Sequence, residues 1–463
     1  MTAASLSACA TNPATGERQL SLISPEQEVA MGREAAAQVQ QTLGFVDMPE
    51  LQSYVSRIGQ TLARTSERPD LPWEFHVVDD PVPNAFALPG GFIYVTRGMM
   101  NLMTTEAQLA SVLGHEIGHV TARHSVNQIS KQQLAQLGFG LGAVFVPQVR
   151  PFESLLGTGL GLLFLKYGRD DEREADTLGF GYILRHDYDV RQFDDVFEVL
   201  ERAGGEEGAI PNWLSTHPAP GERAEAAEAR ASGITQDADV RVGREDYLRR
   251  IDTLVYGNDP RDGFFRDGVF YHPRLRFQIE FPGEWQSANL TQAVVAAAPQ
   301  NRALLQLTLA GDAKPDRALA RFYEQAGVQA GRAVRATVGG EPAAMGEFQA
   351  NTQSGVVQGL VSFVTAGGRT YQIVGYTSAE LYGSFAKIFE RSIRSFGPVT
   401  RSDILSVQPD RIDIVQLSRP MTVEEFAKEY DSSVPADELA LLNHQPSADS
   451  RIPAGTLLKR VIG

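Results

Sequence analysis

Cysteine is nearly absent from this chain of 463 residues, and Cys9 is its only one. A lone cysteine excludes an internal disulfide bond and any zinc site built from thiolates alone. Basic residues are also fewer than acidic ones. The chain has 42 Lys and Arg and 57 Asp and Glu, which gives a formal net charge of -15. Nucleic-acid binding requires a basic face, so this charge argues against DNA or RNA as a partner.

Long apolar runs are missing as well. The most apolar region, Leu134–Leu165, is interrupted by Pro147, Arg150, Pro151 and Glu153. Its two pieces of about a dozen residues are shorter than the roughly 20 residues of a membrane-spanning helix, so no transmembrane helix is expected. The region can pack in a core or form a lid near a site. No internal repeat indicates a helical-repeat array.

The most informative pattern in the chain is His115-Glu116-x-x-His119, within the stretch Leu109–Asn127. Positions i and i+4 of a helix lie about 40° apart, so both imidazoles face one way and can bind one metal ion. Glu116 lies beside them and can accept a proton from a water on the metal. The same pattern also arises by chance in long helices, so its meaning depends on its surroundings.

The flanking sequence favours a helical backbone for this motif. Thr105 and Gln108 have the spacing of a capping box at the head of the motif helix. Further upstream, Ser24 is expected to cap a helix that runs towards Gln41, and apolar residues at helical spacing predict another from about Pro49 to Arg64.

A third zinc ligand is not found next to the motif. Zinc hydrolases commonly use three protein ligands and leave one position open. A metzincin would have Gly and His where this chain has Ala122 and Ser125, so that class is excluded. His124 is about 180° around the helix from His115, which predicts a place on the helix surface or behind the ligands. A carboxylate on another helix is then expected.

A candidate for that carboxylate is Glu172-x-x-x-Asp176, whose two acids share one face of a predicted helix. By themselves these acids are equally compatible with a solvated surface. Together with the His-Glu-x-x-His motif, the pattern resembles the zinc metallopeptidases that include HtpX, the CaaX prenyl endopeptidases and BepA. The resemblance implies one Zn²⁺ per chain, with Glu172 as the third ligand and Asp176 as its support. Glu174, about 200° from Glu172, is not expected to bind the ion.

Two more stretches resemble this family, and the similarity covers about residues 25–235. Asn84, Ala85 and Phe86 begin a segment that leads through a Pro-Gly-Gly turn to Phe92–Thr96 and predicts a β-hairpin. An edge strand there can hold a substrate in extended form.

The second stretch is Thr216-His217-Pro218, which with Arg223 resembles the His-Pro segment of the periplasmic BepA-like branch. The resemblance implies that His217 lies near the zinc and can gate it, and that Arg223 steadies the oxyanion. Without the family, His217 reads as a turn residue.

The sequence changes character after about residue 259. Residues 259–397 mix strand-like and helical segments, which predicts an α+β domain whose arrangement resembles the PsbP-like fold. Residues 400–463 resemble a LysM module through Met421–Ala427 and Glu438–Asn443. Such modules bind glycans such as peptidoglycan, and a structural cap that binds nothing is the alternative.

At the other end, residues 1–24 are predicted to be a tail. Leu6-Ser7-Ala8-Cys9 resembles a bacterial lipoprotein processing box, in which the cysteine becomes lipidated and anchors the protein to a membrane. The basic start and apolar core of a signal peptide are missing before it. The alternative is a disordered tail with an incidental cysteine.

Taken together, these patterns predict a mainly α zincin-type metalloprotease domain with a small β-hairpin or sheet over residues 25–255. An α+β domain and a small LysM-like module are expected to follow. The resemblance implies a zinc metalloendopeptidase of the gluzincin type in the bacterial periplasm or cell envelope, acting on misfolded or unassembled proteins. The rival prediction is an envelope chaperone or scaffold with a closed zinc site, or a latent protease if His217 is a fourth ligand.

Overall fold

The computed structural model describes residues 9–138, 166–204, 213, 216–217, 220–236, 239–290, 292–352 and 355–463. Packing divides the chain into two compact units. Unit 1 contains the described residues up to Asn258 together with Asp410–Gly463, and unit 2 contains Asp259–Pro409. Of the predicted C-terminal module, residues 400–463, the part from Asp410 onward thus packs within unit 1. Beyond Gly138, the apolar region Leu134–Leu165 lies outside the described residues. Its role as a lid or as core packing therefore stays a prediction.

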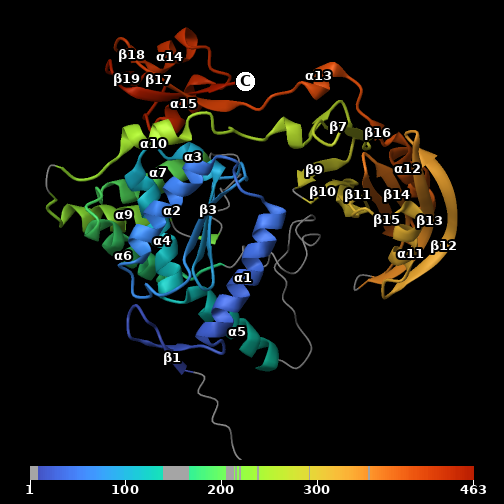
Figure 1. Cartoon of the computed structure of the whole chain (residues 1–463), viewed down its shortest axis with the longest axis horizontal. Helices are drawn as coiled ribbons and strands as arrows, with labels where there is room; N and C mark the ends of the chain where they lie inside the picture. Colours follow the sequence, from blue (N-terminus) through green and yellow to red (C-terminus); the bar gives the residue numbers. More distant parts are fainter. Residues whose placement is uncertain are drawn as a thin grey trace, which may run out of the picture. The chain divides into compact units, whose positions relative to one another are not determined.

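Unit 1 surrounds a three-stranded sheet with helices (Figure 1). The sheet has the order β3-β5-β4, with β3 parallel and β4 antiparallel to the central β5. The helices are α1 (Pro25–Thr42), α2 (Pro49–Ala63), α3 (Arg97–Leu102), α4 (Glu106–Thr121), α5 (His124–Gly138), α6 (Arg169–Arg185), α7 (Gln192–Gly204), α9 (Pro220–Ser232), α10 (Arg244–Ile251), α14 (Val423–Glu429) and α15 (Ala436–Leu442). The strands are β1 (Cys9–Thr11), β2 (Arg18–Leu20), β3 (Glu74–Val78), β4 (Ala85–Leu88), β5 (Phe92–Thr96), β17 (Arg411–Gln416), β18 (Met421–Thr422), β19 (Arg451–Ile452) and β20 (Leu457–Ile462).

The predicted elements before the motif are confirmed. The Ser24 side chain accepts from the amide of Gln27 at the head of α1, and the Gln27 side chain accepts from the amide of Ser24, which completes a capping box. Helix α2 ends within one residue of the expected Arg64. Strands β4 and β5 pair across the Pro-Gly-Gly turn as the predicted hairpin.

Helix α4 carries the motif and is buried along its whole length. The hydroxyl of Thr105 accepts from the amide of Gln108, which is one half of the predicted capping box, whereas the Gln108 side chain accepts from the amide of Thr104 instead of Thr105. The helix ends at Thr121, because Arg123 adopts a left-handed backbone with φ of 60°, and α5 begins at His124. The expectation that His124 lies half a turn from His115 on the same helix is therefore wrong. The helix break at Arg123 gives the His124 side chain a direction that a continuous helix would not give it.

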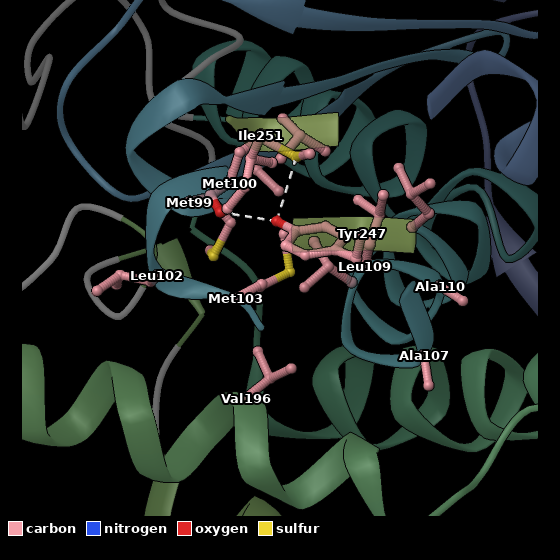
Figure 2. Close-up of a cluster of buried hydrophobic side chains, with 14 of the residues drawn as sticks. Met99, Met100, Leu102, Met103, Ala107, Leu109, Ala110, Val196, Tyr247 and Ile251 are labelled. Carbon is pink, nitrogen blue, oxygen red and sulfur yellow. Dashed lines mark hydrogen bonds between the residues drawn. The ribbon is translucent and has the colours of Figure 1, made fainter. Parts of the chain in front are cut away.

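A cluster of buried side chains fixes the head of α4 (Figure 2). Met99, Met100 and Met103 pack there with Leu109 and with Tyr247 of α10. The Tyr247 hydroxyl donates to the carbonyl oxygen of Met100 at 2.7 Å. Burial of these large apolar side chains stabilises the connection between α3 and α4 by about 2 kcal/mol per residue.

The N-terminal segment is ordered over its described part. Strands β1 and β2 pair as an antiparallel hairpin, and the Asn12 side chain between them is only 5% exposed. The alternative of a disordered tail is therefore wrong for these residues. The Cys9 side chain lies outside the described atoms, so its lipidation stays a prediction.

Unit 2 is rich in strands, so the predicted order of a helical region followed by an α+β region agrees with the structure. A seven-stranded antiparallel sheet has the order β12-β13-β14-β15-β11-β10-β9, and a four-stranded sheet has the order β16-β8-β7-β6 (Figure 1). The strands are β6 (Phe264–Arg266), β7 (Val269–His272), β8 (Phe277–Glu280), β9 (Gln286–Leu290), β10 (Ala293–Ala297), β11 (Ala303–Leu309), β12 (Val328–Val338), β13 (Glu341–Thr352), β14 (Gly355–Ala366), β15 (Arg369–Ser378) and β16 (Gly397–Pro398). The α-helices are α11 (Pro315–Tyr323), α12 (Tyr382–Ser395) and α13 (Ser402–Leu405), and η3 (Pro260–Asp262) and η4 (Pro299–Asn301) are short 3-10 turns.

Two hydrophobic clusters in unit 2 draw on alternate residues of the same strands. Phe363 packs in the cluster with Leu319 of α11, whereas Val364 packs in the cluster with Phe389 of α12. Successive side chains of a strand point to opposite faces, so α11 and α12 cover opposite faces of the sheet. In the parts of the chain described, no helix is both long and apolar enough to cross a membrane.

Candidate metal centre

Helices α4 and α6 approach closely because glycines line their contact. A Cβ atom at Gly118 would lie 2.8 Å from the carbonyl oxygen of Ala175, and one at Gly179 would lie 2.7 Å from the amide nitrogen of His115. Any side chain at either position would push the helices apart. The close contact places the acidic face of α6 beside the motif histidines.

Four buried side chains converge at this contact. His115, His119, Glu172 and His217 each offer one donor atom, and these atoms all lie within 4.8 Å of one another. The Nε2 atoms of His115 and His119 are 3.0 Å apart, and His217 Nδ1 is 3.3 Å from His115 Nε2. Glu172 Oε1 lies 3.5 Å from His119 Nε2 and 3.0 Å from His217 Nδ1.

These donors fit a zinc ion. Zinc favours four nitrogen, oxygen or sulfur ligands in a tetrahedron at about 2.0–2.2 Å, which sets neighbouring donors about 3.3 Å apart. The observed separations scatter around that value, and the imidazole and carboxylate donors are of the right kind. The four side chains thus offer donors that would fit a zinc ion.

Glu116 provides a second sign that a bound group belongs here. Its carboxylate is fully buried, and neither oxygen has a hydrogen-bond partner among the described residues. An unpaired buried carboxylate is costly unless a partner binds beside it. The position beside two ligand histidines suits a water held by the metal.

Asp176 and Arg223 support the cluster from one side. Asp176 Oδ1 lies 2.9 Å from His115 Nδ1, the ring nitrogen that faces away from the cluster. Arg223 of α9 donates to both oxygens of Asp176, at 2.7 and 2.8 Å, and its Nη1 lies 2.7 Å from Glu172 Oε2. Burial raises the pKa of Asp176, but the charge and hydrogen bonds of Arg223 outweigh it and lower the pKa to about 2.

The charge states of His119 and Glu172 suit metal binding. Burial lowers the pKa of His119 well below its ordinary value, so its ring is neutral, as a ligand must be. Burial opposes ionisation of Glu172, but His217 and His119 lower the pKa of the carboxyl below its ordinary range. For His217, burial lowers the pKa, and the adjacent Glu172 raises it above its ordinary value.

Aromatic rings that were not predicted enclose the histidines. Tyr167 stacks on His119 with ring centroids 4.0 Å apart, and Trp213 stacks on His217 at 4.9 Å. The amide of His217 donates to the carbonyl oxygen of Trp213 at 2.8 Å, which fixes the turn that carries the histidine. Each ring stands in sequence just before a predicted site segment, and that proximity was the available signal.

The predicted substrate strand lies at the edge of the small sheet. Strand β4 pairs with β5 on one side, and no other described strand pairs with it. Phe86 is buried and stacks on Tyr94 with centroids 5.0 Å apart. The side-chain carbonyl of Asn84 has no hydrogen-bond partner among the described residues. Strand β4 also packs against α4.

The sequence-predicted residues fall into two groups in space. His115, His119, Glu172 and His217 form one cluster, and Glu116, Asp176 and Arg223 touch it directly. Asn84, Ala85 and Phe86 belong instead to the neighbouring hairpin. The catalytic and ligand roles of these residues stay predictions.

Residues 49–231 of the chain match the profile of peptidase family M48. This match spans the motif helix, α6 and the segment of His217 and Arg223.

The chain is also similar to curated relatives. The mitochondrial metalloendopeptidase OMA1 of Schizosaccharomyces pombe is 32% identical over 46% of this chain and 63% of its own length. The beta-barrel assembly-enhancing protease of Escherichia coli K12 is 27% identical over 64% of this chain and 59% of its own length. The chain thus spans about three fifths of the length of these two relatives.

Among solved structures, the cyanobacterial PsbP protein of Synechocystis has 14% sequence identity and a TM-score of 0.24, and covers 28% of this chain and 91% of its own. A TM-score this low supports no conclusion about the fold, so the PsbP-like arrangement stays a prediction. The resemblance to BepA-like metallopeptidases is confirmed, and residues 49–231 of this chain are a peptidase family M48 domain.

Proposed function

We propose that this protein is a zinc-dependent endopeptidase of the bacterial cell envelope that cleaves misfolded or unassembled proteins. The observation that carries the proposal is the buried His115, His119 and Glu172 cluster, beside which the Glu116 carboxylate has no hydrogen-bond partner among the described residues. The family match and the names of the relatives, a metalloendopeptidase and a protease, support the same reaction class.

Zinc bound by His115, His119 and Glu172 would polarise the scissile carbonyl and make its water more acidic. Glu116 then holds the proton taken from that water and delivers it to the leaving amine. Neither of its oxygens has a hydrogen-bond partner among the described residues, so both can accept from that water. His115 is held in place by Asp176, whose oxygen faces the outer nitrogen of the ring.

Substrate would bind along β4. The strand has an unpaired edge among the described residues and packs against α4, so a peptide added there would lie close to the motif. The free carbonyl of Asn84 offers an acceptor for a substrate amide. Arg223 is the nearest guanidinium to the donors and is proposed to steady the oxyanion.

A latent protease is the second candidate, and the position of His217 favours it. Its Nδ1 atom lies within 3.3 Å of both His115 Nε2 and Glu172 Oε1, where a fourth ligand would stand, and its Nε2 is 3.7 Å from Glu116 Oε1. If His217 closes the site, His217→Ala should raise proteolysis several-fold. If His217 serves catalysis, the same variant should lower it.

The deciding experiment compares degradation of casein by zinc-loaded protein with and without a chelator. The proposal expects cleavage that the chelator abolishes and that added zinc restores. Absence of cleavage in both wild type and His217→Ala, with zinc bound in each, would favour the chaperone or scaffold instead.

Two further parts of the proposal concern location. Residues 400–463 are proposed to contact peptidoglycan, and Cys9 is proposed to carry a lipid. A peptidoglycan pull-down of the full chain, compared with a chain ending at Pro409, tests the first. Mass spectrometry of the protein expressed in a bacterial host, with Cys9→Ala as control, tests the second.

A further inference from the structure

His124 of α5 lies behind the ligand histidine His119. The Nε2 atom of His119 faces the cluster, 3.0 Å from His115 Nε2, so its Nδ1 atom faces outward. That Nδ1 lies 2.9 Å from His124 Nδ1, and the His124 side chain is 3% exposed. The contact exists because the helix breaks at Arg123 and turns His124 back towards the preceding helix.

The hydrogen-bond direction between the two rings follows from metal binding. If His119 binds through Nε2, its proton stays on Nδ1, which must donate. His124 Nδ1 is then the acceptor, so His124 carries its own proton on Nε2. The reverse direction would leave His119 with a proton on Nε2, the atom needed by the metal.

The outward nitrogen of His124 faces carboxylates of α6. His124 Nε2 lies 3.6 Å from Glu174 Oε2 and 3.9 Å from Asp171 Oδ1. A carboxylate there favours a proton on Nε2 and therefore selects the direction that leaves His119 ready to bind. Glu174 is not expected to bind the metal, but its carboxylate faces His124, which contacts the ligand His119.

Asn12 of the N-terminal hairpin holds Glu174 from the other side. Its side-chain amide donates to Glu174 Oε1 at 2.6 Å, so the two oxygens of Glu174 serve two different partners. The hairpin is itself tied to the same region. The amide of Leu22 donates to Ser130 Oγ of α5, and Arg123 donates to the carbonyl oxygen of Ile23, both at 3.0 Å.

We infer that His124, Glu174 and Asn12 are positioning residues for the proposed metal site, and that the N-terminal hairpin stabilises zinc binding through them. His119 would have an outer partner of its own, as His115 has Asp176. The difference is that an imidazole is inserted between the ligand and the carboxylate. This inference rests on the proposed zinc site.

Zinc affinity of the purified full chain, measured by competition with a chromogenic chelator, tests the inference. Substitution of outer partners commonly weakens metal binding by about 10- to 100-fold, and we expect His124→Ala to do so. His124→Asn places a carbonyl oxygen near the position of Nδ1 and should recover most of the affinity. The absorption bands of the Co²⁺ form should change in His124→Ala and return in His124→Asn.

Glu174→Gln and Asn12→Ala should weaken zinc binding in the same direction and by less. Gln carries no charge and has one carbonyl oxygen, so it cannot both accept from Asn12 and present a carboxylate oxygen to His124 Nε2. The double variant of His124→Ala with Glu174→Gln should bind zinc no more weakly than His124→Ala alone. The reason is that Glu174 is inferred to act on the metal site through His124. Asp170→Asn is the matched control, since this carboxylate of the same helical turn is 97% exposed.

Equal zinc affinity in wild type and His124→Ala would overturn the inference, and so would a His124→Asn variant as weak as His124→Ala. Strictly additive losses in the double variant would also contradict it. A wild-type protein that takes up no zinc would instead refute the proposed metal site and this inference with it.

Discussion

At the scale of single residues, nearly every buried polar atom of the candidate centre has a matched partner. Asp176 is paired with His115 and Arg223, and Glu172 lies against Arg223 and His217. Burying such charges is unfavourable unless they are paired, so these contacts keep the donors in place. Glu116 is an exception, because neither of its oxygens has a hydrogen-bond partner among the described residues, and His217 Nε2 comes only within 3.7 Å of Oε1.

Replacing Glu116 by Gln should separate metal binding from catalysis. The amide has the same shape, and Glu116 is not one of the proposed zinc ligands, so zinc content should be unchanged. It cannot accept the proton, so casein cleavage should fall by at least about 100-fold. Zinc stoichiometry and cleavage rates of the purified variant check this, and a fully active Glu116→Gln would contradict the assignment.

Asp195 of α7 gives a prediction on pH. Burial, together with the carboxylates of Asp194 and Glu198, raises the pKa of Asp195 from its ordinary 3.8 to about 6. The folded state therefore holds this proton more tightly than the unfolded state. The stability from Asp195 is fully present below pH about 3.8 and is lost as pH rises through about 6.

Asp195→Asn removes this loss, since the amide carries no charge. At pH 8 the variant should exceed the wild type by on the order of 1–2 kcal/mol after solvent screening, and the gain should vanish towards pH 4. Urea unfolding at both pH values measures the difference. Asp449→Asn, in an exposed loop position, should leave stability unchanged, and a less stable Asp195→Asn at pH 8 would show that the burial argument fails.

At the scale of elements, the contact between α4 and α6 decides whether a site exists. The two helices supply His115, His119 and Glu172, and Gly118 and Gly179 set how closely they approach. A shift of about 1 Å between the helices would move the carboxylate out of bonding distance, given zinc–ligand distances near 2 Å.

Gly179→Ala should therefore weaken both folding and metal binding. The added methyl group would lie 2.7 Å from the amide nitrogen of His115, a backbone atom that cannot move alone. We expect a loss of about 1–3 kcal/mol in unfolding free energy and a clear drop in zinc affinity.

Gly181→Ala is the control for that variant. It lies on the same helix, and the nearest atom to its added Cβ is the end of the flexible Arg185 side chain, at 4.0 Å. Stability should stay the same or rise by up to about 1 kcal/mol, because Ala favours the helix over Gly. Equal behaviour of the two variants would rule out close packing as the cause.

At the scale of the whole molecule, the end of the chain belongs to unit 1. The Lys459 ammonium of β20 is fully buried and donates to the carbonyl oxygens of Asn101, Leu102 and Met103, at 2.7, 3.2 and 3.0 Å. His444 Nε2 lies 2.9 Å from the same Leu102 oxygen. The C-terminal segment thus holds the end of α3, directly before α4.

Lys459→Met should destabilise unit 1 by roughly 2–4 kcal/mol, because several buried carbonyl groups lose their donor at once. Lys428→Met is a matched control, since that side chain is 74% exposed and its pair with Glu424 contributes little. Denaturant unfolding followed by tryptophan fluorescence compares the two. A Lys459→Met variant as stable as wild type would mean that the segment does not support unit 1.

Local patterns in the sequence determined the elements that carry the motif. Thr105, the spacing of His115 and His119, and the Pro-Gly-Gly turn act over a few residues, so their outcome does not depend on the remaining fold. The prediction that Glu172 lies beside those histidines came from the family resemblance. A contact between helices that are distant in the sequence produces no local sequence pattern.

Tertiary structure alone decided what stands behind the ligands. The left-handed turn at Arg123 brought His124 to His119, although a continuous helix would have turned it away. Asn12, Glu174 and Lys459 have ordinary surface-type sequence contexts, and only packing gave them buried partners. Helical spacing determines which residues share a face, whereas helix breaks and close packing determine what each face meets.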